Sequence, residues 1–116
     1  MKHIESQTQQ ACVRWFRLQY PELAPLLFAV PNGGRRDATT GAVLKAEGVV
    51  AGVSDLILLV PSAQSHALCI ELKTTTGRQS PRQKQWAQAV TEQGYRYAIV
   101  RSLEQFIQTI TEDLRA

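Results

Sequence analysis

Two short segments of the chain carry the residue types that a metal-dependent hydrolytic site needs. The first, GVSD (residues 52–55), ends at Asp55 and leads into an apolar run, and the second, ELK (residues 71–73), closes another apolar run. Side chains alternate between the two faces of a strand, so Glu71 and Lys73 share one face while Leu72 lies on the other. Charged groups at the end of an apolar strand are costly unless they are paired or bind a metal. The pattern therefore indicates a divalent-metal site.

The residue types suit magnesium and phosphodiester hydrolysis. Mg²⁺ prefers near-octahedral oxygen ligation and usually takes one or two protein carboxylates together with waters and substrate oxygens. Asp55 and Glu71 match this demand in type and number, and the Leu72 carbonyl could complete the set. Lys73 cannot be a ligand while protonated, but it can orient or deprotonate the attacking water and neutralise developing charge. We therefore expect Mg²⁺ as the cofactor, with Mn²⁺ able to replace it.

The elements that must position these residues follow from hydrophobic periodicity and turn signals, in the order α-β-α-β-β-α-β-α. Helices are predicted over residues 4–20, 39–47, 81–93 and 103–114, and strands over residues 26–30, 55–60, 67–73 and 96–101. Ser80 and Gln83 form a capping-box pattern around Pro81. The helix between the last two strands favours parallel pairing of those strands. The fold class is therefore α/β, with a central mixed β-sheet flanked by helices, in one domain of residues 1–116.

Composition is that of an ordinary globular domain, with 44% hydrophobic and 20% charged residues among 116. No apolar run approaches the roughly 20 residues of a membrane span, and residues 1–10 lack the apolar segment of a signal peptide. We therefore expect a cytoplasmic protein with no membrane partner. Cys12 and Cys69 lie within apolar patterns, which favours buried hydrophobic roles over a disulfide or a zinc site.

The distribution of basic residues is more informative than the net charge of +3. Residues 73–84 contain four lysines and arginines and no acid, and Arg35 and Arg36 lie in a glycine-rich loop. Two basic segments beside a carboxylate pair suit a polyanion that must approach a metal. An ordinary solvated surface is the alternative interpretation.

Asp55 followed by the ELK triplet resembles the PD-(D/E)xK nuclease superfamily, with Ser54 where that pattern expects proline. A triplet of this kind is a weak signal by itself. The likeness to one family extends over nearly the whole chain, through Glu5 with Gln9, VPNGGRR (30–36), LKAEG (44–48), GVSD (52–55), ELK (71–73), GRQSPRQ (77–83) and GYRYAIVR (94–101). Together these segments resemble a stand-alone VRR-NUC domain. The resemblance implies a restriction-endonuclease-like core and a homodimer that cuts four-way DNA junctions.

The resemblance also implies roles for individual residues. Asp55 and Glu71 would be metal ligands, Lys73 the catalytic lysine, Glu5 an acid near the metal and Gln83 a further active-site residue. Gln83 could instead cap a helix, and Glu5 could be an acid favoured in the first turn of a helix. DNA contacts are expected from Asn32, Arg35, Arg36, Lys45, Arg78, Ser80 and Arg82. For Trp15, Trp86 and Tyr95 we favour core or interface positions over base stacking.

The function predicted is that of a Mg²⁺-dependent, structure-specific DNA endonuclease that resolves four-way (Holliday) junctions. Resolution needs two symmetric cuts, and a two-fold dimer of this small chain would supply two sites. Alternative enzymes are a nickase, a flap nuclease or an end-processing nuclease. An alternative from another class is a DNA-binding module without turnover, which has no need to hold two carboxylates close to phosphates.

Overall fold

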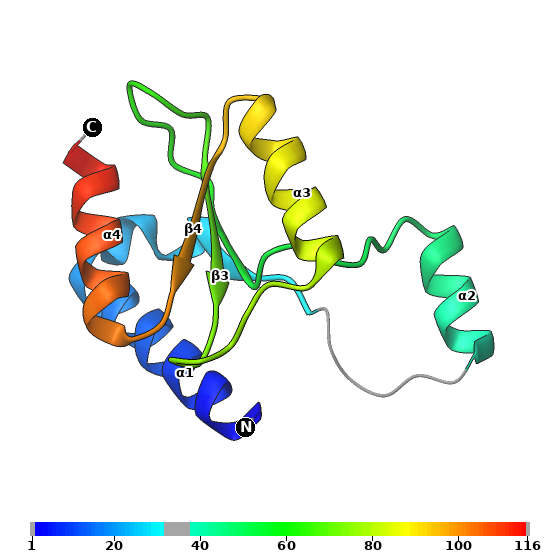
Figure 1. Ribbon diagram of the computed structural model, residues 1–116. Helices are drawn as coiled ribbons and strands as arrows, with labels where there is room; N and C mark the ends of the chain where they lie inside the picture. The colour runs from blue at the N-terminus through cyan, green and yellow to red at the C-terminus, as the bar shows by residue number, and fades with distance from the viewer. Residues whose placement is uncertain (1, 32–37, 116) are drawn as a thin grey trace.

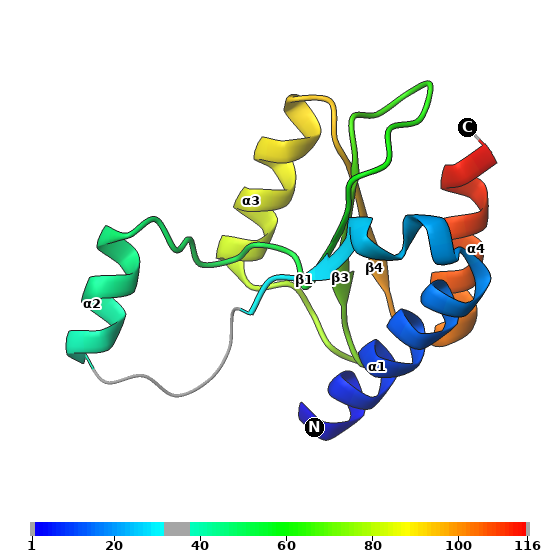
Figure 2. The same ribbon diagram turned by 180° about the vertical axis from the view of Figure 1, so that it is seen from behind.

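The protein folds around a four-stranded mixed β-sheet with helices on both faces (Figures 1 and 2). The computed structural model describes residues 2–31 and 38–115. The strands lie in the order β1 (Leu27–Ala29), β2 (Leu56–Leu58), β3 (Leu68–Leu72) and β4 (Arg96–Val100). The first two pairings are antiparallel, and β3 pairs with β4 in parallel. The predicted mixed sheet and its parallel pair are confirmed.

The helices divide unequally between the two faces of this sheet. Figures 1 and 2 show α1 (Lys2–Gln19) and α4 (Leu103–Arg115) covering one face and α3 (Pro81–Glu92) covering the other. The short helix α2 (Ala38–Ala46) stands away from the body of the molecule beyond α3. Among the described residues, no helix combines the length and apolar character that a membrane span needs.

The hydrophobic core lies between the sheet and the α1–α4 layer. It contains side chains of α1, α4 and alternate residues of β3, chiefly Cys12, Phe16, Leu68, Ile70, Leu72, Phe106 and Ile110. Both cysteines are free and buried, as the sequence predicted, and burial raises the pKa of the Cys12 thiol to about 12. Helix α3 contains no fully buried residue. The α3 face of the sheet is therefore the less sealed one, and it carries the polar residues of β3.

Two local features differ from the sequence prediction. Strand β2 has three residues rather than six, because its partner β1 also has only three. Two backbone hydrogen bonds of 2.9 Å continue the pairing beyond the strand ends, from the Val30 N–H to the Asp55 carbonyl and from the Leu59 N–H to the Leu26 carbonyl. A 3₁₀ helix, η1 (Pro21–Leu26), connects α1 to β1 and was not predicted. Its two prolines lack N–H donors, so the segment has the sequence pattern of a loop.

Candidate active site

Two carboxylates meet where β3 ends. Asp55 directly precedes β2, and its Oδ2 accepts a hydrogen bond of 2.7 Å from the Leu72 N–H of the neighbouring strand. Glu71 is only 2% exposed, and its side chain lies on the α3 face, where it contacts Gln83. The pairing of β2 with β3 therefore brings the two acids together, as the sequence predicted.

The segment before Asp55 is held tightly against α3. Gly52 has a φ of +90°, and a Cβ at this position would lie 2.6 Å from the Arg82 carbonyl oxygen. Only glycine accommodates both the left-handed backbone and this close approach. Ser54, at the position where a proline was expected, is fully buried and donates to the Leu56 carbonyl at 3.2 Å. These contacts explain how a loop residue such as Asp55 keeps a defined position.

Uncharged donors hold both oxygens of Glu71. The Gln83 side-chain amide donates to Oε2 at 3.1 Å, and the Tyr97 hydroxyl donates to Oε1 at 3.2 Å. Tyr97 in turn accepts a hydrogen bond of 3.1 Å from the Gln79 amide. Amide and phenol donors orient a carboxylate without neutralising its charge. Each oxygen also keeps a lone pair for a further partner.

Burial and the neighbouring Asp55 together disfavour the charged form of Glu71. Burial is the larger effect, and the two raise the pKa of Glu71 to about 8, against the opposing influence of Lys73 and the Tyr97 hydroxyl. Burial, followed by the nearby Glu71, also raises the pKa of Tyr97, which keeps its phenol a proton donor. Two carboxyl groups that share one site favour binding of a cation.

The geometry fits a hard divalent cation held by oxygens. The Lys73 N–H donates to the Val100 carbonyl at 3.0 Å, whereas the Leu72 N–H turns to Asp55, so the Leu72 carbonyl also lies on the Asp55 side of β3. Two carboxylates and one carbonyl form an oxygen donor set of the kind that Mg²⁺ takes. Within residues 2–31 and 38–115, no group of three or more His, Cys, Asp or Glu side chains is placed to hold a metal. Glu5 lies half-buried in α1, and its role near a metal stays a prediction.

Gln83 has two roles that the sequence left as alternatives. Its Oε1 accepts from the Ser80 N–H at 2.8 Å, and its own N–H donates to the Ser80 hydroxyl at 3.2 Å, which confirms the capping box. Its Nε2 points the other way and donates to Glu71. The cap therefore fixes the amide that orients the acid.

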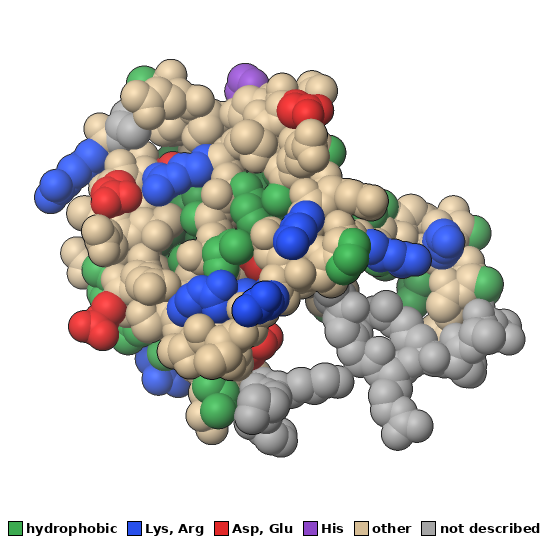
Figure 3. Space-filling view, viewed as in Figure 1, with side chains coloured by type: hydrophobic (Ala, Val, Ile, Leu, Met, Phe, Trp, Pro, Cys, Tyr) green, Lys and Arg blue, Asp and Glu red, His purple; other side chains and the backbone are tan. Residues whose placement is uncertain are grey.

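The predicted DNA-contacting residues fall into two groups. Lys45, Arg78, Ser80 and Arg82 are exposed, and Figure 3 shows basic side chains spread over this face from the end of the sheet toward α2. Asn32, Arg35 and Arg36 lie outside the described residues. The exposed residues are accessible to a polyanion, and their contacts with DNA stay a prediction.

Three residues that the sequence analysis missed organise the site. Tyr97 and Gln79 belong to the hydrogen-bonded group around Glu71, and Arg101 donates from Nη1 to the carbonyls of Thr74 and Gly77 at 2.7 Å each. Arg101 therefore anchors the loop that follows Lys73. The sequence shows only that Tyr97 and Ile99 lie on the same face of their strand. The register pairs Tyr97 with Cys69 and Ile99 with Glu71, and this register places Tyr97 on the face of the sheet that carries Glu71.

Comparisons with known proteins agree with this architecture. The model of the VRR-NUC domain family matches residues 4–104. A solved structure of a VRR-NUC domain protein is 23% identical in sequence and superposes with a TM-score of 0.83, covering 96% of this chain and 88% of the other. No match was found among curated proteins. Because the family model spans most of the 116 residues, the chain belongs to the VRR-NUC domain family and is a nuclease-type DNA-processing domain.

Proposed function

We propose that this protein is a Mg²⁺-dependent endonuclease that hydrolyses phosphodiester bonds in branched DNA, with four-way junctions as substrate and a homodimer as the active species. One observation carries the proposal: Asp55 and Glu71 lie together beside Leu72, and both Glu71 oxygens are held by uncharged donors. A carboxylate pair oriented but not neutralised is suited to a divalent cation. Mn²⁺ is expected to replace Mg²⁺ because it accepts the same oxygen ligands.

The side chains divide the work of the reaction. Asp55, Glu71 and the Leu72 carbonyl would hold the metal, and bound Mg²⁺ would supply charge stabilisation and an activated water. Lys73 lies two residues after Glu71, and its charge opposes the rise in the pKa of Glu71, so Lys73 is the candidate cation for stabilising charge on the reacting phosphate. Gln83, Tyr97 and Gln79 orient Glu71. Glu5 remains a proposed acid at the edge of this site.

Exposed basic residues support a DNA substrate over a small phosphate ester. Arg78 and Arg82 lie on either side of the α3 cap, and Lys45 lies on α2. Such residues position the backbone of DNA without reading its sequence. A homodimer would place two such surfaces and two metal sites across a branch point, as paired cuts require.

The test is cleavage of labelled duplex, flap, fork and four-way junction DNA with Mg²⁺, Mn²⁺ or EDTA. We expect cleavage only with metal, with paired symmetric cuts in the junction. Cuts in one strand only, or at flaps and ends, would favour a nickase, flap or end-processing enzyme. Metal-independent binding with no cleavage of any substrate would favour the DNA-binding module.

A mixing experiment tests the dimer separately. Heterodimers of the wild type with Glu71→Gln should nick one strand of a junction without resolving it, because one site is dead. Light scattering should give about twice the chain mass of 12.9 kDa. Symmetric resolution by a monomer would contradict the dimer.

A further inference from the structure

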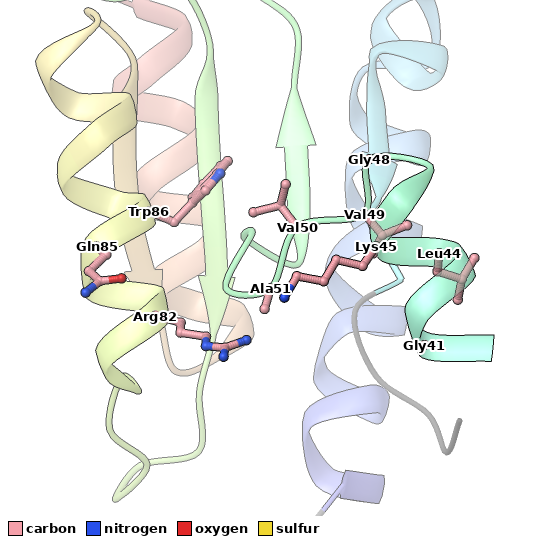
Figure 4. A pocket seen from close by; sticks show the side chains of 10 residues that line it. All are labelled: Gly41, Leu44, Lys45, Gly48, Val49, Val50, Ala51, Arg82, Gln85 and Trp86. Atoms are coloured by element: carbon pink, nitrogen blue, oxygen red, sulfur yellow. The ribbon is translucent and has the colours of Figure 1, made fainter. Parts of the chain in front are cut away.

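A groove of about 680 Å³ separates α2 and the segment after it from α3, next to the candidate active site (Figure 4). Lys45 and the segment 48–51 form one wall, and Arg82, Gln85 and Trp86 of α3 form the other. This volume falls within the range of about 300–1,000 Å³ typical of ligand sites. The groove is therefore large enough for a ligand of small-molecule size.

The charge of the groove selects an anion. Figure 4 shows Lys45 and Arg82 extending into the groove from opposite walls. Neither side chain makes an ion pair with another described residue, since both salt bridges found there belong to Arg96. No acidic residue lines the groove. Two cations that converge without a counter-ion attract a negatively charged group such as a phosphate.

The rest of the groove is apolar, which phosphate contact alone does not require. Val49 and Val50 are 42% and 54% exposed, and Val50 lies across from the half-buried Trp86 in Figure 4. The sequence favoured a core or interface position for Trp86, but its half-buried indole lines the groove. An indole opposite aliphatic side chains suits a flat aromatic ligand. A basic groove combined with an aromatic wall is how proteins bind unpaired nucleotides, because every base presents a π face.

The groove is physically connected to the candidate active site. Arg82 directly precedes Gln83, whose amide holds Glu71. The opposite wall leads through Gly52, packed against the Arg82 backbone, to Asp55. The groove and the candidate site therefore share two walls, which places them side by side along α3.

We infer that this groove binds an unpaired nucleotide of branched DNA, with Trp86 stacking on the base and Lys45 and Arg82 contacting the flanking phosphates. This inference rests on the proposed function and adds a condition to it: a base pair at the branch point must open so that one nucleotide of the junction can enter the groove. A base inside a duplex is stacked and paired and cannot enter.

The experiment measures binding by the full chain carrying Glu71→Gln, so that no DNA is cut. The probes are a blunt duplex, the same duplex with a single-stranded flap, and the flap strand alone. Each carries 2-aminopurine at the same position of the sequence, which is the branch position in the flap probe. Trp86→Ala should weaken binding to both probes with unpaired bases by about tenfold or more, the scale of one lost stacking contact, and should remove the quenching of 2-aminopurine. Blunt duplex should bind nearly as before, and Trp86→Phe should restore most of the affinity.

Two matched variants separate the ligand role of the groove from its part in folding. Tyr95→Ala removes another exposed aromatic side chain, 38% exposed and outside the groove, and should change nothing. Val50→Asp places a negative charge in the groove without touching the contact between Trp86 and Tyr97, and should reproduce the selective loss. The melting temperature of each variant verifies that it is folded.

Several outcomes would overturn the inference. These are equal losses on duplex and unpaired probes, no loss in either groove variant, or a lower mass by light scattering for Val50→Asp, which would assign the groove to a second copy of the chain. If the inference alone fails, the wild type still cuts branched DNA with metal. If the proposed function fails, the wild type cuts none of these probes with Mg²⁺ or Mn²⁺, whether or not it binds them.

Discussion

Two acids, Glu71 and Asp113, are equally buried at 2% exposure but have opposite environments. Asp113 on α4 pairs with the Arg96 guanidinium at 3.3 Å, and Glu112 reaches the same arginine at 3.5 Å. Glu71 has amide and phenol donors instead, with a second carboxylate beside it. No arginine pairs with Glu71 among the described residues. The first arrangement pairs a charge within the fold, whereas the second has no cationic partner in the described part of the chain and favours the protonated acid until a cation binds.

The difference distinguishes an acid with a cationic partner in the fold from the acid that we propose binds metal. Both acids lie near strands of the same parallel pair, since Arg96 begins β4 and Glu71 is in β3. Burial alone therefore does not identify a site. The type of partner is more informative, because a cationic or apolar neighbour would stabilise a buried acid more than a second carboxylate does.

The largest effect should come from removing Glu71, the acid proposed to bind metal. Glu71→Gln keeps the shape of the side chain and its contact with Tyr97, but it loses a charged metal ligand, so cleavage of junction DNA should fall below detection while DNA binding survives or tightens. Asp113→Asn is the matched control and should cut normally at temperatures where it is folded. Single-turnover cleavage assays measure both, and wild-type rates in Glu71→Gln would remove Glu71 from the site.

Lys73, near Glu71, and Arg96, paired with Asp113, should also differ in what their removal affects. Lys73 makes no ion pair with a described residue, which leaves its charge available to the reaction. Lys73→Ala should slow cleavage by about 10²-fold or more, with metal binding largely intact. Calorimetry with Mg²⁺ and single-turnover rates test these two claims. Normal turnover in Lys73→Ala would exclude a catalytic role.

Arg96 should matter for folding and not for chemistry. Arg96→Met leaves the Asp113 carboxylate buried, where its Oδ2 already lacks a hydrogen-bond partner. We expect the free energy of unfolding to fall by about 2–4 kcal/mol, toward the lower part of the range for a broken buried pair because the Arg96 side chain is 35% exposed. Adding Asp113→Asn should recover part of the loss. Urea unfolding measures the free energy of unfolding of each variant. If the double variant loses the sum of the two single losses, Arg96 and Asp113 do not interact.

Stability without metal should depend on pH through Glu71. The pKa of this residue is raised from 4.5 to about 8 in the fold, so the native state binds the proton more tightly than the unfolded chain does. The stabilising contribution of the protonated form is therefore complete below about pH 4.5 and is lost as pH rises toward about 8. Melting temperatures in EDTA across this window should decline for the wild type. The decline should be smaller for Glu71→Gln, and equal slopes would contradict the assignment.

The smallest effect should be a change in the salt dependence of binding. Arg78→Ala and Arg82→Ala, next in sequence to Gln79 and Gln83, should each weaken binding to all DNA sequences similarly and reduce the salt slope by about one unit per lost phosphate contact. Arg115→Ala, at the end of the helix that carries Asp113, is the control and should leave the slope unchanged. Equal slopes in all three variants would return Arg78 and Arg82 to the ordinary solvated surface.

The sequence by itself determined the order of the α-helices and strands and identified the acids that we propose bind metal. Hydrophobic periodicity predicted the helices and the sheet strands, and the Ser80 capping box and the alternation of β3 were visible because they depend on residues within a few positions of each other. Asp55, Glu71 and Lys73 were recognisable for the same reason. Glu71 interrupts an apolar strand, and Asp55 and Lys73 lie at the ends of apolar runs, so each pattern is visible within a few residues.

Only the tertiary structure determined which groups surround these acids. The β3–β4 register places Tyr97 beside Glu71, the close approach at Gly52 brings α3 to Asp55, and Arg96 finds Asp113 17 residues further along the chain. None of these contacts has a local pattern, because each joins segments brought together by chain pairing and packing. The pKa of Glu71 and the groove beside α3 depend on those same contacts. They are properties of the assembled fold rather than of any single segment.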